Sequence, residues 1–283
     1  MMLRLETMPS AVRRAVRYVL SDIDDTLTSR GRLEVEAFAS LAALQASARK
    51  VVLVTGRPAG WCDHIARMWP VNGLVGENGA FYFTYDDEAR GMTRRFVRSA
   101  EQRREDLLRL LSLSRSVIEK VPGCAVSSDQ AYRSTDMAID FREDVAPLPF
   151  EVACRIRDLF EAAGVCAKVS SIHVNAWFGD HDKLSTTRLL FREVFQEELD
   201  DVKDQVVYVG DSPNDAPMFD FFENSIGVAN IMDFSGDIQT LPRYITRERG
   251  GKGFAELVPL FLEPMVGESS CSAVAESKKG RYA

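Results

Sequence analysis

Near its start the chain reads Tyr18-Val19-Leu20-Ser21-Asp22-Ile23-Asp24-Asp25-Thr26, an apolar run that ends in acidic side chains. Residues 17–23 predict a short buried β-strand. Alternation along a strand puts Asp22 and Asp24 on one side, so their carboxylates face the same small volume. Like charges this close repel unless a cation joins them or one carboxyl is protonated. The stretch therefore predicts a functional site at the end of a strand.

The segments on either side of the middle of the chain alternate between strand and helix patterns. Residues 50–55 and 205–209 are apolar runs of strand length, and residues 33–44, 58–69 and 184–195 carry apolar side chains at helical spacing. This order predicts an α/β fold, a parallel sheet with helices on both faces. In such a sheet the ligand crevice lies beyond the carboxyl ends of the strands.

The middle of the chain has a different pattern. It predicts a long helix at 100–119, a second helix near 150–163, and alternating strands near 135–141 and 171–177. Alternating strands are typical of a half-exposed antiparallel sheet. We therefore expect a core of residues 1–83 and 178–265, an inserted α+β domain at 84–177, and a flexible Gly- and Ser-rich tail at 266–283.

Composition excludes several classes of function. The net charge of −7 gives no general attraction to nucleic acid or anionic lipid, and no run approaches the length needed to cross a membrane. The five cysteines are odd in number and form no C-x-x-C pair, which argues against a disulfide framework or a zinc site. We expect a cytoplasmic protein with no nucleic-acid or membrane partner; its oligomeric state is open.

Three further segments carry polar groups that suit phosphate chemistry. Thr55-Gly56 ends a strand, Asp182-Lys183 begins a helix, and Gly210-Asp211-Ser212-Pro213-Asn214-Asp215 follows another strand. Each has a plain alternative, since Thr55-Gly56 is an ordinary turn, Lys183 a surface lysine and Asp215 the acid of a capping box begun by Ser212. Their order, with apolar strands delivering three of the four segments, favours one shared site.

In that order the four segments resemble the motifs of the haloacid dehalogenase-like phosphohydrolases. Asp22-Ile23-Asp24-Asp25-Thr26 is similar to the D-x-D-x-T signature, followed by Thr55, Lys183 and the Gly210–Asp215 stretch. The resemblance implies a Rossmann-like core with a type-two cap. Glu77-Asn78-Gly79 before the insert and Gly250-Gly251-Lys252-Gly253 resemble the type IIB subgroup of Cof-type, sucrose-phosphate and mannosyl-3-phosphoglycerate phosphatases. One departure is Asp25, where relatives often have Gly.

The resemblance implies a magnesium-dependent phosphomonoesterase acting on a small phosphorylated metabolite, with a sugar phosphate favoured. Asp22 would be the nucleophile and Asp24 the general acid and base. Mg²⁺ would be held by Asp22, the backbone carbonyl of Asp24 and Asp211. The remaining implied roles are phosphate binding by Thr55, Gly56 and Lys183, and support of the metal shell or of Lys183 by Asn214 and Asp215.

The insert resembles a cap that contacts the leaving group. It has fourteen basic and fifteen acidic residues between Tyr85 and Trp177, so it does not suit a polyanion. Its last strand puts His173, Asn175 and Trp177 on one face, which suits a hydroxyl-rich ligand but is equally a solvated outer face. Arg133 and Arg142 are candidates for a second anionic group. Three further candidate substrate residues lie in the core: Arg57, Glu77 and Asn78.

Three other classes of protein stay open. A phosphomutase or phosphotransferase would use the same aspartyl chemistry and return the phosphoryl group to its substrate. A signalling receiver domain also combines acidic residues with Thr and Lys, although it is shorter and has no such insert. A non-catalytic binding protein on this fold would be expected to have lost one of the four motifs, and all four are present here.

Overall fold

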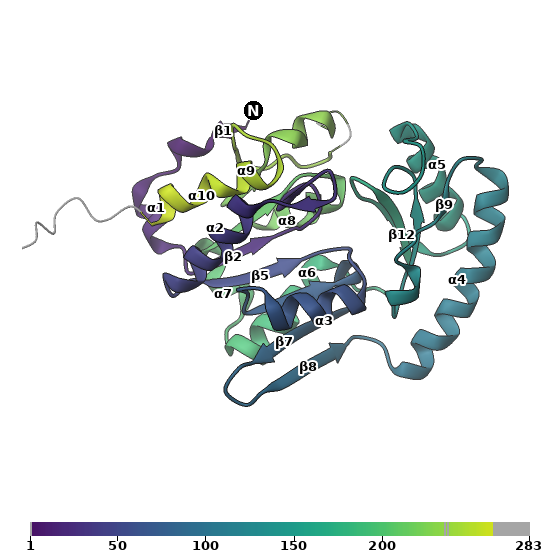
Figure 1. Ribbon diagram of the computed structural model, residues 1–283, viewed down its shortest axis with the longest axis horizontal. Helices are drawn as coiled ribbons and strands as arrows, with labels where there is room; N and C mark the ends of the chain where they lie inside the picture. The colour runs from purple at the N-terminus through teal and green to yellow at the C-terminus, as the bar shows by residue number, and fades with distance from the viewer. Residues whose placement is uncertain (1, 235, 237, 263–283) are drawn as a thin grey trace, which may run out of the picture.

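The computed structural model describes residues 2–234, 236 and 238–262, so the tail expected at 266–283 lies outside the described residues. Two bodies lie side by side in Figure 1: a core built on a large sheet, and a smaller cap. Among the described residues no helix is long and apolar enough to cross a membrane.

The core sheet has nine strands, and its middle is parallel. In spatial order the strands are β1 (Leu3–Arg4), β15 (Tyr244–Ile245), β14 (Ser225–Gly227), β13 (Val206–Gly210), β2 (Tyr18–Ser21), β5 (Lys50–Val54), β6 (Gly73–Gly76), β7 (Phe81–Asp86) and β8 (Gly91–Phe96). Neighbouring strands from β1 through β6 are parallel, whereas β7 pairs antiparallel with both β6 and β8. The predicted α/β class, with a mostly parallel sheet, is confirmed.

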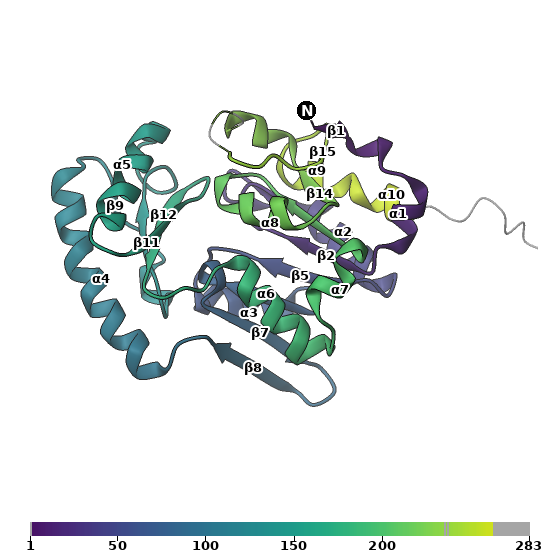
Figure 2. The same cartoon turned by 180° about the vertical axis from the view of Figure 1, so that it is seen from behind.

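Helices cover both faces of this sheet (Figures 1 and 2). One face carries α1 (Ser10–Ala15), α2 (Val35–Ala46), α3 (Ala59–Met68), α9 (Gly250–Ala255) and α10 (Leu257–Phe261). The other carries α6 (Lys183–Leu190), continued by η4 (Phe191–Phe195), with α7 (Leu199–Val202) and α8 (Ala216–Phe221). Side-chain alternation causes this division, because Val19 of β2 enters the first apolar core and Leu20 the second.

Short elements complete the core and its edges. The hairpin of β3 (Thr28–Ser29) and β4 (Arg32–Leu33) follows the first acidic motif. The other short helical segments of the described residues are η1 (Leu5–Thr7), η2 (Glu77–Gly79), η3 (Gln130–Tyr132), η5 (Lys203–Gln205), η6 (Pro213–Asp215) and η7 (Ala229–Phe234).

The cap is a four-stranded antiparallel sheet with two helices on its outer face. Its strands, in spatial order, are β11 (Cys166–Val169), β12 (His173–Trp177), β10 (Met137–Asp140) and β9 (Ala125–Val126). The helices α4 (Ala100–Lys120) and α5 (Phe150–Glu161) pack on one face of the sheet. Figure 1 shows β12 nearer the core and α4 on the far side.

Two expectations about the insert need correction. The expected boundary at residue 84 falls inside β7, and β7 and β8 both pair within the core sheet, so the inserted part begins after Phe96. The sheet is also not half-exposed at its centre, since every residue of β10 and β12 is buried. The core covers the face that the helices leave open, and alternation alone does not reveal this second contact.

Candidate active site

The first group of site residues lies where three neighbouring parallel strands end. β13, β2 and β5 are adjacent, with Ser21 in register with Val209 on one side and Leu53 on the other. The next residues along these strands therefore meet at one edge of the sheet. There the backbone amide of Asp22 donates to Val209 O at 2.9 Å. The sheet topology thus brings Asp22, Thr55 and Asp211 to the same edge.

Lys183 reaches this edge from the start of α6. Its Nζ donates to Asp22 Oδ1 at 2.8 Å and to Asp215 Oδ1 at 2.7 Å. Burial lowers the pKa of Lys183, but the charges of Asp215 and Asp22 outweigh it and raise that pKa above its usual value. The helix start lies close to Gly79, where a Cβ would fall 2.0 Å from Asp182 O. With its φ of +106°, Gly79 is needed for this approach.

Both carboxylate oxygens of Asp215 accept hydrogen bonds, and one of these bonds supports Lys183. Its Oδ1 accepts from Lys183 and, at 2.5 Å, from the hydroxyl of Tyr208, while its Oδ2 accepts from the backbone amides of Asp211 and Ser212 at 3.1 and 3.3 Å. Asp215 and Ser212 also form the reciprocal capping box expected from the sequence. Gly210 makes room for this carboxylate, because a Cβ there would lie 2.5 Å from Asp215 Oδ2.

The buried carboxylates of Asp22, Asp211 and Asp215 form a cluster suited to a metal ion, with ligand oxygens within 4.8 Å of one another. Asp215 accepts four hydrogen bonds through its two oxygens, whereas Asp211 accepts one at each oxygen and Asp22 one at Oδ1, so Asp22 and Asp211 are the better metal ligands of the three. Burial raises the pKa of Asp22 to about 8; the charge of Lys183 lowers it, while that of Asp215 raises it. Burial and the charge of Asp22 likewise raise the pKa of Asp211. Such crowding of buried oxygen ligands fits a hard divalent cation such as Mg²⁺.

Asp24 is held by a charged residue that also contacts the cap. Arg57 donates from Nε to Asp24 Oδ1 at 2.8 Å, and its Nη2 lies 2.6 Å from Glu143 Oε1 of the cap. Glu143 in turn contacts His173 Nε2 at 2.9 Å. Burial would raise the pKa of Glu143, but its bonds with His173 and Arg57 lower it to about 2. The carboxylate of Asp24 is thus oriented through one oxygen, and among the described residues its Oδ2 accepts no hydrogen bond.

The cap lies directly over these carboxylates. The turn between β11 and β12, together with His173 and Asn175, lines a cavity that also touches Asp22, Asp24 and Asn214. Its volume is about 10 Å³, close to the space that a single water needs. The two side chains are buried, at 2% exposure each, so the alternative of a solvated outer face is wrong for this strand.

The other candidate substrate residues differ in whether they lie at this cavity. Arg133 is fully paired with Asp129 and Asp136 and donates to Gly56 O at 3.0 Å, so it ties the cap to the core. Asn175 lies in the cavity and donates to Asp136 at 2.9 Å. Trp177 lies apart from the cavity, stacked on His181 with its Nε1 bonded to the carbonyl of that residue.

Glu77 and Asn78 occupy the turn between β6 and β7 of the core, where the core contacts the cap. Glu77 accepts from the backbone amides of Ala59, Ser134 and Thr135 at 2.8, 2.9 and 2.7 Å, so its carboxylate anchors the cap. Asn78 packs against Gly56, and its Nδ2 is buried without a hydrogen-bond partner among the described residues. Asn78 is therefore the one of the two with a donor left for a ligand.

Sequence reasoning missed three residues that complete this site. Tyr208 supports Asp215, Glu143 holds Arg57, and Asn230 donates to Asp211 Oδ2 at 3.1 Å. Asn230 lies shortly after β14, so its place beyond a parallel strand is a signal that could have pointed to it. Glu143 gives no such signal, because it lies in a loop 86 positions from its partner.

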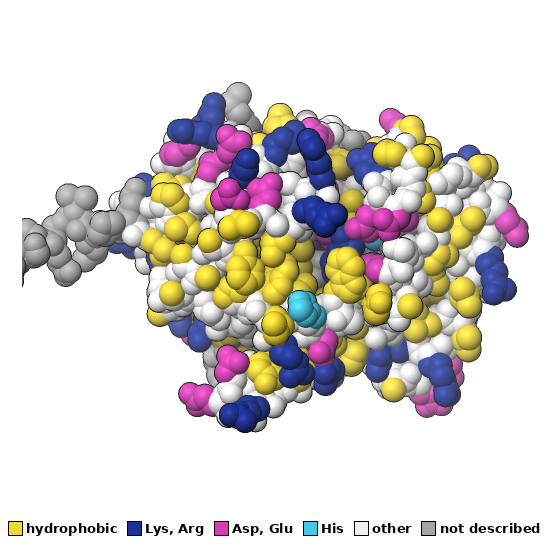
Figure 3. All heavy atoms as spheres, viewed as in Figure 1, with side chains coloured by type: hydrophobic (Ala, Val, Ile, Leu, Met, Phe, Trp, Pro, Cys, Tyr) yellow, Lys and Arg dark blue, Asp and Glu magenta, His cyan; other side chains and the backbone are white. Residues whose placement is uncertain are grey.

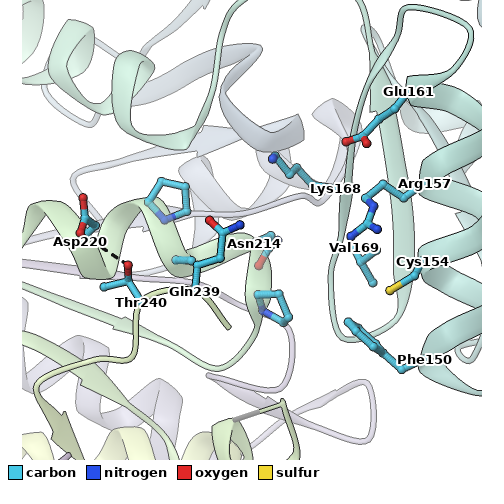
Figure 4. Close-up of a pocket in the computed structure, with 13 residues that line it drawn as sticks. Phe150, Cys154, Arg157, Glu161, Lys168, Val169, Asn214, Asp220, Gln239 and Thr240 are labelled. Carbon is cyan, nitrogen blue, oxygen red and sulfur yellow. Dashed lines mark hydrogen bonds between the residues drawn. The ribbon is translucent and has the colours of Figure 1, made fainter. Parts of the chain in front are cut away.

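A wide cleft opens on one flank of the site. It has a volume of about 660 Å³ and lies between the cap elements α5 and β11 and the core helix α8. Figure 4 shows Arg157 and Lys168 of the cap facing Asn214 and Gln239 of the core. Across the floor Thr240 bonds to Asp220 at 3.5 Å. Asn214 connects this cleft with the small cavity at the carboxylates.

Comparisons with known proteins agree with this architecture. Residues 19–140 match the family model of the haloacid dehalogenase-like hydrolases. Over these residues the chain is similar to the haloacid dehalogenase-like hydrolases, in agreement with the order of its four motifs. Comparison of the sequence with curated proteins gives no match.

Solved structures with the same fold span nearly the whole chain. Protein 0175 of Thermoplasma acidophilum has a TM-score of 0.64 at 19% identity, covering 87% of this chain and 98% of its own. The sucrose-phosphatase of Synechocystis, in complex with sucrose and phosphate, has a TM-score of 0.58 at 15% identity, covering 88% and 98%. The subclass IIB sugar phosphatase BT4131 has a TM-score of 0.54 at 14% identity, covering 82% and 93%. At these identities the likeness concerns the fold.

Proposed function

We propose that the protein is a magnesium-dependent phosphomonoesterase that acts on a small phosphorylated metabolite through an aspartyl-phosphate on Asp22. One observation supports this most: Asp22, buried at 4% exposure, lies within bonding distance of Lys183 and beside Asp211. A buried carboxylate next to one fixed cation and a second carboxylate suits attack on phosphorus. A sugar phosphate is the favoured substrate, because two of the structural relatives are named as sugar phosphatases.

In the first step an oxygen of Asp22 forms a bond to phosphorus while the bond from phosphorus to the leaving oxygen breaks. Lys183 and the backbone amides after Thr55 hold the other phosphate oxygens, where negative charge builds. Asp24 gives its proton to the leaving oxygen. Arg57 holds Asp24 by one oxygen, which leaves Oδ2 to face the leaving group.

In the second step water attacks the aspartyl-phosphate. Asp24, now ionised, takes a proton from that water, and inorganic phosphate leaves. Mg²⁺, held by Asp22, Asp211 and the backbone carbonyl of Asp24, would neutralise the charge that the carboxylates and the phosphate bring together. The cap excludes bulk water, since its turn at 170–173 covers the carboxylates.

A cytoplasmic location is part of the same proposal. Among the described residues the buried Cys62 and Cys124 and the exposed Cys166 form no disulfide. Thiols of this kind are typical of a reducing compartment.

The test is acid-quenched incubation with para-nitrophenyl phosphate and Mg²⁺, followed by mass spectrometry of the peptide that contains Asp22. We expect nitrophenol release and a phosphoryl group on that peptide, and neither in Asp22→Asn. Activity that survives in Asp22→Asn would contradict the proposal. A panel of phosphorylated metabolites, assayed for released phosphate, would then identify the substrate. Return of the phosphoryl group to a sugar would point to a mutase instead.

A further inference from the structure

The space beside Asp24 shows where the leaving group can lie. Asp24 and Arg57 line both the 10 Å³ cavity over the nucleophile and a larger one of about 320 Å³, which we call the Asp24 cavity. Because the general acid must touch the leaving oxygen, the rest of the leaving group extends along Asp24. The Asp24 cavity lies between core and cap, since Ile172 and Arg142 of the cap and Thr28 and Arg30 of the core hairpin line it too.

A second cavity also touches Asp24, and it is apolar. It has a volume of about 340 Å³, and its walls include Leu33, Trp61 and Trp69. All of its lining residues come from the core, so no cap residue joins it to the cavity over the nucleophile. The Asp24 cavity, by contrast, shares Ile172 with that small cavity. The Asp24 cavity is therefore the better place for a leaving group enclosed by the cap.

The loop that carries Arg142 into the Asp24 cavity is fixed by one carboxylate. Asp140, at the end of β10, accepts from the backbone amides of Arg142, Glu143 and Asp144 at 2.9, 2.8 and 2.8 Å. This arrangement presents two adjacent side chains of opposite charge. Glu143 accepts a hydrogen bond from Arg57, and Arg142 is held in place before any ligand binds.

The guanidinium of Arg142 retains unused donors. Its Nη2 reaches only Leu148 O at 3.3 Å, and its plane lies near the ring of Phe141, 4.8 Å from the centroid. Its Nε is buried without a hydrogen-bond partner in the described part of the chain. An Arg with free donors and no carboxylate partner is typical of a site for a carboxylate or a phosphate.

Two arginines of the Asp24 cavity are left without a carboxylate partner. Its lining includes three arginines and three acids, and Arg57 pairs with two of the acids, Asp24 and Glu143. Asp25 is the remaining acid. Among the described residues neither Arg30 nor Arg142 has an ion pair with a carboxylate, so two guanidiniums face one acid.

The same two arginines also line the adjoining space. A cavity of about 620 Å³ shares Asp25, Thr28, Arg30 and Arg142 with the Asp24 cavity, and Lys252 joins them there. Figure 3 shows basic and acidic side chains gathered together at the junction of core and cap. Acidic residues line this space as well, among them Glu34, Asp233 and Glu248, so the arginines that the two cavities share, Arg30 and Arg142, are the groups left for an anion.

We propose that the leaving group of the substrate carries a second anionic group, a carboxylate or a phosphate, that binds Arg142 and Arg30 in the Asp24 cavity. This rests on the proposed phosphatase function and adds a substrate class to it. The role of Arg142 is substrate binding, because it contacts the far end of the leaving group. Arg133, the other cap arginine considered from the sequence, is excluded because Asp129 and Asp136 occupy its donors.

The experiment compares matched substrate pairs. One pair is 3-phosphoglycerate with glycerol 3-phosphate, which differ by a carboxylate; the other is fructose 1,6-bisphosphate with fructose 6-phosphate, which differ by a phosphate. For at least one pair we expect kcat/KM of the wild-type protein to be about 10-fold or more higher for the more anionic member. The pair that shows the preference identifies the anion.

Variants then assign the preference to the arginines. Arg142→Gln should remove most of the preference, by lowering kcat/KM for the more anionic member of a pair far more than for the other member. Arg30→Gln, on an exposed turn, should reduce the preference without affecting folding. Arg157→Gln is the matched control, because it changes a cap arginine that lines the opposite cleft. Thermal melting of each variant checks that it is folded.

Two outcomes would overturn the inference: no preference in either pair, or equal losses for both members of a pair in Arg142→Gln. A preference for apolar aryl phosphates that depends on Trp61 would place the leaving group in the apolar cavity instead and would also overturn it. Failure to hydrolyse even para-nitrophenyl phosphate would contradict the phosphatase function itself, so the two failures are distinguishable.

Discussion

Arg57 donates through Nε to Asp24 across 2.8 Å, although the two residues lie on different strand ends of the core. The same guanidinium, 3% exposed as a whole residue, lies 2.6 Å from Glu143 of the cap. The position of the expected general acid is therefore tied to the position of the cap. A substitution at Arg57 tests whether this tie matters for turnover.

Arg57→Lys should lower kcat/KM for an alkyl phosphate by about 10-fold or more, because one ammonium cannot span Asp24 and Glu143 as a planar guanidinium does. Steady-state kinetics on the wild-type and variant proteins measure the change. Arg94→Lys is the matched control, since Arg94 forms an exposed pair with Asp63 and should be neutral. Equal activity of Arg57→Lys and the wild-type protein would show that catalysis does not require Arg57 to position Asp24.

Asp24→Asn should affect alkyl and aryl phosphates unequally. An alkoxide needs a proton as it leaves, and general acid help is typically worth about 10²–10⁴-fold, whereas nitrophenolate leaves largely unaided. Without a base the second step also slows, so stopped-flow traces with the aryl substrate should show a burst of nitrophenol. If no burst appears and the rates for the alkyl and aryl phosphates fall by the same factor, Asp24 has only a structural or metal-ordering role.

Chelation of divalent cations should abolish turnover of para-nitrophenyl phosphate, and Mg²⁺ should restore it. Ca²⁺ should restore it poorly, because its longer and looser coordination misplaces the nucleophile. Nitrophenol release in excess chelator, followed by titration of each cation, measures this. Full activity in the chelator would contradict the metal assignment.

Mg²⁺ should stabilise the protein more at pH 8.5 than at pH 6. Burial raises the pKa of Asp22 from its usual 3.8 to about 8 in the metal-free fold. A carboxyl with a raised folded-state pKa contributes stability below its unfolded pKa and loses it as the pH rises through the folded value. Mg²⁺ favours the charged form and offsets that loss. Thermal melting with and without Mg²⁺ gives the shift in melting temperature at each pH. An equal shift at pH 6 and pH 8.5 would contradict the prediction.

Gly210→Ala should weaken both stability and activity, because its Cβ would meet Asp215 Oδ2 at 2.5 Å and displace the support of Lys183. Overpacking of this kind costs about 1–3 kcal/mol in free energy of unfolding. Urea denaturation and aryl-phosphatase rates measure the two effects. Gly91→Ala, where the nearest atom is 3.9 Å away, should stay within about 0.5 kcal/mol of the wild-type protein. Similar behaviour of the two variants would show that Asp215 can shift freely.

Glu77→Gln should destabilise the fold by about 1.5–3 kcal/mol, since a carboxamide cannot accept all the amide bonds that link Glu77 to Ala59, Ser134 and Thr135. Burial raises the pKa of Glu77 to about 7, so urea denaturation belongs at pH 8, where the carboxyl is ionised. The control Glu105→Gln, on the exposed side of α4, should be neutral. An unchanged unfolding midpoint in Glu77→Gln would show that these bonds add no net stability.

Local patterns in the sequence were enough to predict the α/β core and to place the acidic motifs at the ends of its strands. Alternation along residues 17–23 predicted both the strand and the shared side of Asp22 and Asp24, because backbone geometry fixes the side on which each residue points. The helix start at Lys183 and the capping box of Ser212 and Asp215 are local as well. Parallel order then brings such strand ends to one edge of the sheet.

Other features depended on contacts between distant segments. The pairing of β7 and β8 with the core sheet moved the start of the cap beyond residue 84, and contact with the core buried the second face of β12. Arg133 and Arg142 look alike in the sequence, yet Asp129 and Asp136 occupy the donors of Arg133 while the Nε of Arg142 stays without a partner among the described residues.

The physical reason is the range of the interactions involved. Alternation, helical spacing and capping act within a few residues, so the sequence by itself determined the strands, the helices and the acidic strand ends. Whether a charged side chain is paired depends on which distant carboxylate packs against it, and Glu143 reaches Arg57 across 86 positions. Only the tertiary structure could therefore decide which arginines are used within the protein and which remain for a ligand.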